Sequence, residues 1–282
     1  MAFSAGLVSV ALLAGSMSPA VAASQHQAGR AVAPAVAGTV STVAGGPGGP
    51  DPGTNVALSR PCGVSFGGGT VYVADDWSVK RLAPSTDRMA TVAGTGVTGP
   101  LGNGGPALSA TVNTCGTTVD PHGNLVIADS VANQIRVEAS STGTFYGQSM
   151  TAGDIYKVAG GGTDRSRIGN GGPAVGATLG RPNNVATDSA GNLLIPDTIN
   201  DEVRVAAVKT GTFYGQSMTA GHIYAVAGDQ KNGYSGNGGP ATPAELNEPD
   251  QVVVDSAGNL VIADTGNNRV RVVAVKTGTF YG

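Results

Sequence analysis

Residues Asp250–Val275, with the sequence DQVVVDSAGNLVIADTGNNRVRVVAV, contain the pattern that decides the fold. Three short apolar runs, Gln251–Val254, Leu260–Ala263 and Val270–Val275, are rich in Val and Ile and have the length of strands. The breaks between them, DSAGN and DTGNN, supply Asp and Asn side chains that close turns and residues that accept a positive φ. The stretch therefore predicts three antiparallel strands joined by two tight turns.

The same pattern recurs earlier in the chain. Asp120–Ala139 and Asp188–Ala207 keep it in full, and Gly67–Ala83 is a weaker first copy that lacks the G-N-L turn. The asparagine of GNL recurs at steps of 68 and 67 residues, at Asn124, Asn192 and Asn259. A fourth strand-like run ending in Val-Ala-Gly follows each of the first three copies, with its valine at Val92, Val158 and Val226. Four strands in a constant period indicate the blades of a β-propeller.

The order D-x-x-G-N-L-x-I-A-D, followed by T-x-N-x-x-[IV]-R-V, resembles the NHL repeat, and Asp255–Val272 matches it almost position for position. The resemblance covers about Pro61 to Gly282. It implies an all-β fold, a β-propeller of four-stranded antiparallel blades. NHL propellers usually have six blades, whereas this chain has four copies of the repeat.

The two ends of the repeat region suggest how the ring closes. Thr39–Gly45, TVSTVAG, resembles the later fourth strands but precedes the first copy, and the last copy stops at Gly282 before its own fourth strand. One interpretation is that Val40–Gly45 pairs with Val270–Val275, so that the N-terminal strand closes the last of four blades and removes two sheet edges. The other is a fragment of a six-bladed propeller. In both, residues 39–282 form one propeller domain with no helix longer than two turns.

The N-terminal region predicts export. Residues 1–23 have the character of a signal peptide, because Ala5–Ala14 is an apolar core too short to span a bilayer and Ala20-Val21-Ala22 offers small residues for cleavage. The alternative is a buried apolar segment. Residues 24–38 show no periodicity and are expected to be flexible. The sequence thus predicts a secreted, extracellular protein without a transmembrane segment.

Composition narrows the classes of partner. The net charge is −3, with 16 Lys and Arg against 19 Asp and Glu, which argues against a nucleic-acid-binding surface. Only 12% of residues are charged, while 45 of the 282 are Gly, as in a turn-dense protein with many strands. We expect a protein or carbohydrate ligand, and we expect the chain to be a monomer.

Three kinds of repeated motif need a structural and a functional interpretation. The linkers carry GNGGPA at Gly102–Ala107, Gly169–Ala174 and Gly236–Ala241, but no GK[ST] follows, so they favour turns between blades over a phosphate-binding loop. The TGTFYG segments gather aromatic residues that either cover blade edges or form a contact surface, at Phe145, Tyr146, Phe213 and Tyr214.

Aspartates recur at turns and strand ends, at Asp120, Asp188, Asp255, Asp129, Asp197 and Asp264. Turn-closing hydrogen bonds are favoured over a Ca²⁺ site for these carboxylates, although Ca²⁺ stays a candidate cofactor.

One position varies among the repeats, just before each innermost strand. It holds Cys62, Cys115, Asn183 and Asp250, which in a propeller would surround one mouth of the central channel. Two cysteines in adjacent blades of an exported chain predict a disulfide between Cys62 and Cys115. Asn183, Asn184 and Asp250 are the candidate ligand-binding residues, and a mixed Cys/Asn/Asp metal cluster is the alternative.

Catalysis has little support in the sequence. The histidines are His26, His122 and His222, and none falls on an innermost strand, where NHL-like amidating lyases hold a metal. Lactonase-like propellers use Glu, Asp and Asn, which Asn183, Asn184 and Asp250 match only in part because no Glu stands beside them. No nucleophile motif is present. The preferred interpretation is a non-catalytic binding scaffold, and the alternative is a metal-dependent lactonase or lyase at the channel mouth.

Overall fold

The computed structural model describes residues 37, 40–48, 52–83, 85–279 and 281. Within these ranges the chain is almost entirely β, and its helices are 3₁₀ turns of three residues. The prediction of an all-β chain without long helices is confirmed. No helix in the described ranges is long and apolar enough to cross a bilayer. The expected signal peptide, 1–23, and the expected flexible segment, 24–38, lie outside the described residues except for Ala37.

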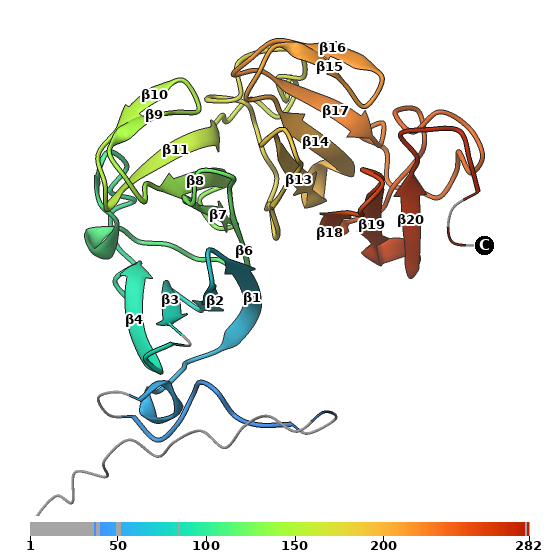
Figure 1. Ribbon diagram of the computed structural model, residues 1–282. Helices are drawn as coiled ribbons and strands as arrows, with labels where there is room; N and C mark the ends of the chain where they lie inside the picture. The colour runs from blue at the N-terminus through green and yellow to red at the C-terminus, as the bar shows by residue number, and fades with distance from the viewer. Residues whose placement is uncertain (1–36, 38–39, 49–51, 84, 280, 282) are drawn as a thin grey trace, which may run out of the picture. The chain divides into compact units, whose positions relative to one another are not determined.

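Four antiparallel sheets form the four blades of the propeller (Figure 1). Blade 1 contains β1 (Pro61–Gly67), β2 (Thr70–Asp75), β3 (Ser78–Ala83) and β4 (Arg88–Ala93). Blade 2 contains β6 (Gly116–Val119), β7 (Leu125–Asp129), β8 (Gln134–Glu138) and β11 (Asp154–Gly160), with β5 (Gly105–Pro106) added outside β11. Blade 3 contains β12 (Ala186–Thr187), β13 (Leu193–Asp197), β14 (Glu202–Ala206) and β17 (Ile223–Ala227). Blade 4 contains β18 (Pro249–Val254), β19 (Leu260–Asp264) and β20 (Arg269–Val273).

The TGTFYG insertions form small hairpins beside blades 2 and 3. They are β9 (Gly143–Phe145) with β10 (Gln148–Met150), and β15 (Gly211–Phe213) with β16 (Gln216–Met218). The 3₁₀ turns are η1 (Gly53–Asn55), η2 (Ala107–Ser109), η3 (Thr198–Asn200) and η4 (Thr265–Asn267). Phe145 and Tyr146 pack against a buried cluster shared by blades 2 and 3, so the first aromatic segment covers the core, as its structural interpretation predicts.

The core lies between neighbouring blades. Along β7, Leu125 and Ile127 pack in the cluster shared with blade 1, whereas Val126 and Ala128 pack in the cluster shared with blade 3. Because side chains alternate across a strand, an inner sheet with two covered faces needs an unbroken apolar run. That requirement explains why LVIAD-type strands recur in the repeats instead of alternating apolar and polar residues.

The turn aspartates are held by hydrogen bonds. Asp188 Oδ1 accepts from the backbone N–H groups of Ala190 and Asn192, each over 2.9 Å, and its Oδ2 accepts from Asn192 Nδ2 over 2.8 Å. Asn192 Oδ1 then accepts from the Val208 N–H, which ties the turn to the end of the third strand. The same network surrounds Asp120 and Asp255. The structural interpretation of these aspartates is confirmed.

The predicted closure of blade 4 by the N-terminal strand is wrong. The sheet of blade 4 has three strands, and Val40–Gly45 forms no strand with Val270–Val275. Gly45 N–H donates instead to Gly53 O over 3.1 Å, and Ala44 packs against the small core of blade 1. Contacts with η1 and blade 1, which are adjacent in sequence, hold this segment beside the first blade.

Candidate binding site at the starts of the innermost strands

The innermost strands of successive blades begin close together. Contacts join β1 to β6, β6 to β12 and β12 to β18. Gly63 and Gly116 stand where these backbones are closest, because a Cβ atom on Gly63 would overlap Cys115 O and one on Gly116 would overlap the backbone of Asn183 and Asn184. Glycine is therefore needed at both positions for the strands to approach each other.

Cys62 and Cys115 form the predicted disulfide. Their Cα atoms are 5.0 Å apart, and the bond joins residues separated by 53 positions. Both residues are exposed, and the bridge connects blade 1, the least regular copy of the repeat, to blade 2. This prediction is confirmed, and it leaves no free cysteine in the chain for a mixed metal cluster.

A hydrogen bond connects the same positions of the next two blades. Asn183 Nδ2 donates to Asp250 Oδ1 over 2.8 Å, across a sequence separation of 67 residues. The amide of Asn183 is thereby oriented by Asp250, and no described group donates to the other carboxylate oxygen of Asp250. The structure thus brings two of the three candidate residues into direct contact.

The side chain of Asn184, the third candidate, is unusual in its hydrogen bonding. Its Oδ1 is buried and accepts no hydrogen bond from the described residues. Buried polar atoms are nearly always paired, and leaving one unpaired costs about 1–3 kcal/mol. The unpaired oxygen belongs to the residue that directly follows Asn183 in the sequence, which makes this position the best candidate for a polar ligand.

Chemically, the cluster offers acceptors. Asp250 contributes a carboxylate oxygen and Asn184 an amide oxygen, and both suit hydroxyl or amine donors. No group of three or more His, Cys, Asp or Glu residues in the described ranges is arranged to hold a metal ion. His122 lies 5.4 Å from the Phe145 ring, His222 Nδ1 contacts Gly171 O, and His26 is outside the described residues.

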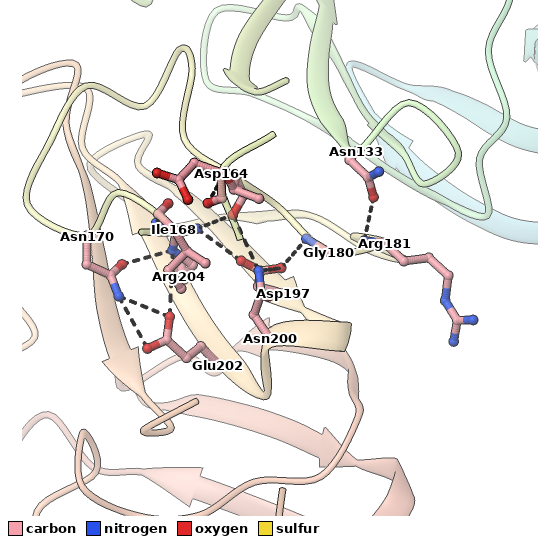
Figure 2. Close-up of polar contacts among 11 residues, drawn as sticks. Asn133, Asp164, Ile168, Asn170, Gly180, Arg181, Asp197, Asn200, Glu202 and Arg204 are labelled. Carbon is pink, nitrogen blue, oxygen red and sulfur yellow. Dashed lines mark hydrogen bonds and ion pairs between the residues drawn. The ribbon is translucent and has the colours of Figure 1, made fainter. Parts of the chain in front are cut away.

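A second polar cluster, inside blade 3, surrounds Arg204 (Figure 2). Its guanidinium donates to Asn170 Oδ1 over 2.9 Å and to Asp197 Oδ2 over 3.0 Å, and it also donates to the carbonyl of Ile168. Asn170 Nδ2 in turn donates to Glu202, whose pKa is raised by burial. Arg204 is fully buried, and its hydrogen-bonding groups are matched, so the cluster is structural.

This cluster explains the GNGGPA loops. Asn103 and Asn237 hold Arg136 and Arg271 as Asn170 holds Arg204, so each loop is fastened to the third strand of the blade that follows it. The arginines also pair with the aspartates that end the second strands, at Asp129, Asp197 and Asp264. The sequence analysis missed the role of the asparagines, because loop and strand are 33 or more residues apart.

Comparison with known proteins supports the same architecture. A family model for the NHL repeat matches residues 246–273. A search of curated protein sequences finds no significant match. Among solved structures, a structural genomics protein of unknown function from Bacteroides thetaiotaomicron is similar over 76% of this chain and 47% of its own, with 15% identity and a TM-score of 0.55. An auxiliary nutrient binding protein from Bacteroides ovatus matches over 77% and 48%, with 17% identity and a TM-score of 0.51. The chain spans about half the length of these structures, and at such identity the similarity concerns the fold.

Proposed function

We propose that this chain, an NHL-repeat β-propeller, is an exported, non-catalytic scaffold that binds a protein or carbohydrate ligand at Asn183, Asn184 and Asp250. The acceptor chemistry of the three side chains favours a carbohydrate, because hydroxyl groups donate to carboxylate and amide oxygens.

The buried, unpaired Oδ1 of Asn184 is the observation that carries the proposal. A hydroxyl of the ligand would supply the missing donor, and the resulting gain compensates for an oxygen that is otherwise left unpaired. Asp250 keeps one carboxylate oxygen for the ligand while the other orients Asn183. The two acceptors come from neighbouring blades, so one ligand that contacts both would bridge blades 3 and 4.

Two further observations support the proposal. The Cys62–Cys115 disulfide suits an oxidising compartment, as expected for an exported protein. A protein of similar fold is described as an auxiliary nutrient binding protein, so this type of propeller has a member with a binding role.

The test is a glycan array probed with the labelled protein, followed by calorimetry with any sugar that binds. We expect Asn184→Ala to weaken binding about tenfold or more, since it removes the acceptor of a buried hydrogen bond. Asp250→Asn should weaken binding less, because its amide oxygen can still accept from Asn183. Asn232→Ala, an exposed asparagine in a linker, is the matched control and should bind as the native protein does.

Binding that both site variants leave unchanged would place the ligand elsewhere. Elemental analysis of the purified protein addresses the enzymatic alternative. Stoichiometric Ca²⁺ or Zn²⁺ that is lost in Asp250→Asn would contradict the non-catalytic scaffold and favour a metal-dependent lactonase or lyase.

A further inference from the structure

In the part of the chain that the structure describes, no strand pairs with the outer edge of β20, the last strand of blade 4. In blade 3, β17 lies between β14 and the glycine-rich loop, where Gly171 N–H donates to Ile223 O over 2.7 Å and Ile223 N–H donates to Gly172 O over 2.9 Å. In blade 4, a cavity of about 250 Å³ lies between β20 and the equivalent loop, Gly236–Gly239. β20 is the outermost strand of its sheet (Figure 1). The N–H of Gly238, equivalent to that of Gly171, donates to no described residue.

The apolar side chains on this side of blade 4 are uncovered. Val270 is 71% exposed and Val272 is 40% exposed. Their equivalents in blade 3, Val203 and Val205, are fully buried. Blade 4 therefore presents a face that is an internal interface everywhere else in the described repeats, with an unpaired strand edge along it.

The opposite end of the row of blades is uncovered in the same way. Val64 on β1 is 74% exposed, whereas the equivalent residues of the later blades are less than a tenth exposed, namely Thr117, Val185 and Val252. Phe66 on the same side of β1 is 70% exposed. Blade 1 thus presents the half of the blade–blade interface that blade 4 lacks.

Ser41–Gly45 carries the sequence of a fourth strand. Thr42–Gly45 repeats the TVAG of Thr91–Gly94, and Gly45 shares a φ near +90° with Gly94. Gly45 N–H donates to Gly53 O over 3.1 Å, as Gly94 N–H donates to Ala107 O over 2.9 Å. The segment therefore enters blade 1 as β4 enters blade 2, and it is placed to be the last strand of a blade preceding blade 1.

We propose that a second copy of this chain supplies that preceding blade. Two copies associate head to tail, so that blade 4 of the first copy packs against the exposed face of blade 1 of the second copy. Ser41–Gly45 of the second copy then pairs with β20 of the first copy. The interface continues the contacts that join the blades within one chain, so no new kind of surface is needed. Strand addition at an open edge and a heterologous contact are both established modes of association.

The register follows from blade 1, where β3 and β4 pair Val79 with Ala93, Lys80 with Thr91 and Arg81 with Ala90. Transferred to the second copy, Ala44 pairs with Val270, Thr42 with Arg271 and Ser41 with Val272. The proposed association differs from the monomer that we expected from the sequence.

Light scattering after size-exclusion chromatography, over a range of concentrations, tests the proposal. The native chain should form dimers or longer rows as its concentration rises. Val64→Lys and Val270→Lys each remove one half of the interface, and each should raise the dissociation constant by about tenfold or more, as expected for a charge in an apolar interface. Val131→Lys, in a turn of blade 2 where the valine is 64% exposed, is the matched control and should associate normally.

Mixing the two variants separates head-to-tail association from a symmetric dimer. Val64→Lys keeps an intact blade 4 and Val270→Lys keeps an intact blade 1, so an equal mixture should form a 1:1 dimer that grows no further. A native chain that stays monomeric at all concentrations, or a mixture that stays monomeric, would overturn the proposal.

A cysteine pair tests the register in case the lysine variants fold poorly. Ser41→Cys mixed with Val272→Cys should form an intermolecular disulfide on mild oxidation. Ser41→Cys mixed with Val253→Cys should not, because Val253 lies on the innermost strand of blade 4. Equal crosslinking in both mixtures would contradict the strand pairing.

Discussion

The phenol of Tyr214 donates a hydrogen bond of 3.0 Å to Oδ2 of Asp188, which lies 26 residues earlier and closes the turn before β13. Tyr146 with Asp120, and Tyr281 with Asp255, repeat this contact at the same spacing. In blades 2 and 3, the hairpin that follows the third strand is therefore fastened to the turn between the first two strands. Burial, followed by the charge of Asp188, raises the pKa of Tyr214, so the phenol stays a donor at neutral pH.

Removing this contact should destabilise the propeller. Tyr214→Phe leaves Asp188 with one donor fewer and should lower the free energy of unfolding by about 1–2 kcal/mol, the usual effect of deleting a buried hydrogen bond to a charged group. Tyr281→Phe is the matched control, because Tyr281 is 68% exposed and water can replace its hydroxyl. Urea unfolding measures both, and equal losses would contradict a buried bond at Tyr214.

The buried arginine of blade 3 should be more sensitive to substitution than its equivalent in blade 4. Arg204→Ala leaves Asp197 without its ionic partner and Asn170 without its donor, and should cost about 3–5 kcal/mol. Arg271→Ala in blade 4 should cost less, because the Arg271 side chain is 11% exposed and its distance to Asp264 is 3.6 Å. Thermal unfolding of both variants checks the order, and a larger loss for Arg271→Ala would contradict it.

The disulfide should contribute measurably to stability. It closes a loop of 53 residues, for which the chain-entropy model gives about 4 kcal/mol. A reducing agent, or Cys115→Ser, should therefore lower the unfolding temperature of the native chain. The double variant Cys62→Ser/Cys115→Ser is the control, since its unfolding should not respond to the reducing agent. Two free thiols per native chain under denaturing, non-reducing conditions would rule out the bond.

Glu138 should give the protein a pH-dependent stability near neutrality. Burial raises its pKa from 4.5 to about 7, and Arg81 offsets this only in part. A carboxyl with a raised pKa in the folded state favours folding when protonated, so its stabilisation is full below pH 4.5 and is lost as the pH rises through 7.

Glu138→Gln should therefore raise the unfolding temperature at pH 8 by a few degrees and flatten its change between pH 5 and 8. Glu248→Gln, at an exposed site, serves as the control and should leave the profile as it is. A native profile that is already flat over this range would contradict a raised pKa for Glu138.

The features that depend on the repeat period and on the turn residues could be predicted from the sequence. Strand order, blade number and the Cys62–Cys115 pairing all follow from equivalent positions in neighbouring repeats. The Asn170–Arg204 contact could not be predicted, because it joins a loop and a strand whose distance depends on how the linker crosses the blade. The pairing of Val40–Gly45 was predicted wrongly for a related reason. The TVAG pattern identifies a fourth strand but does not say which blade that strand joins. The segment instead contacts the elements nearest to it in the sequence, as its hydrogen bond to Gly53 shows.

The hydrogen bond between each GNGGPA loop and the arginine of the next blade also limits which segments of the gene can be duplicated or lost. Asn103, Asn170 and Asn237 each bind the arginine of the blade that follows them, and they recur every 67 residues. A gene duplication of one period that begins at the GNGGPA loop copies the asparagine together with its arginine, so the inserted blade contains both partners. A duplication of one whole period that begins at the first strand has the same result, because each copy of the blade still follows a copy of the loop. Gain or loss of blades by unequal crossing-over is therefore constrained to whole periods of 67 residues, because a partial period would leave an arginine without the asparagine that binds it.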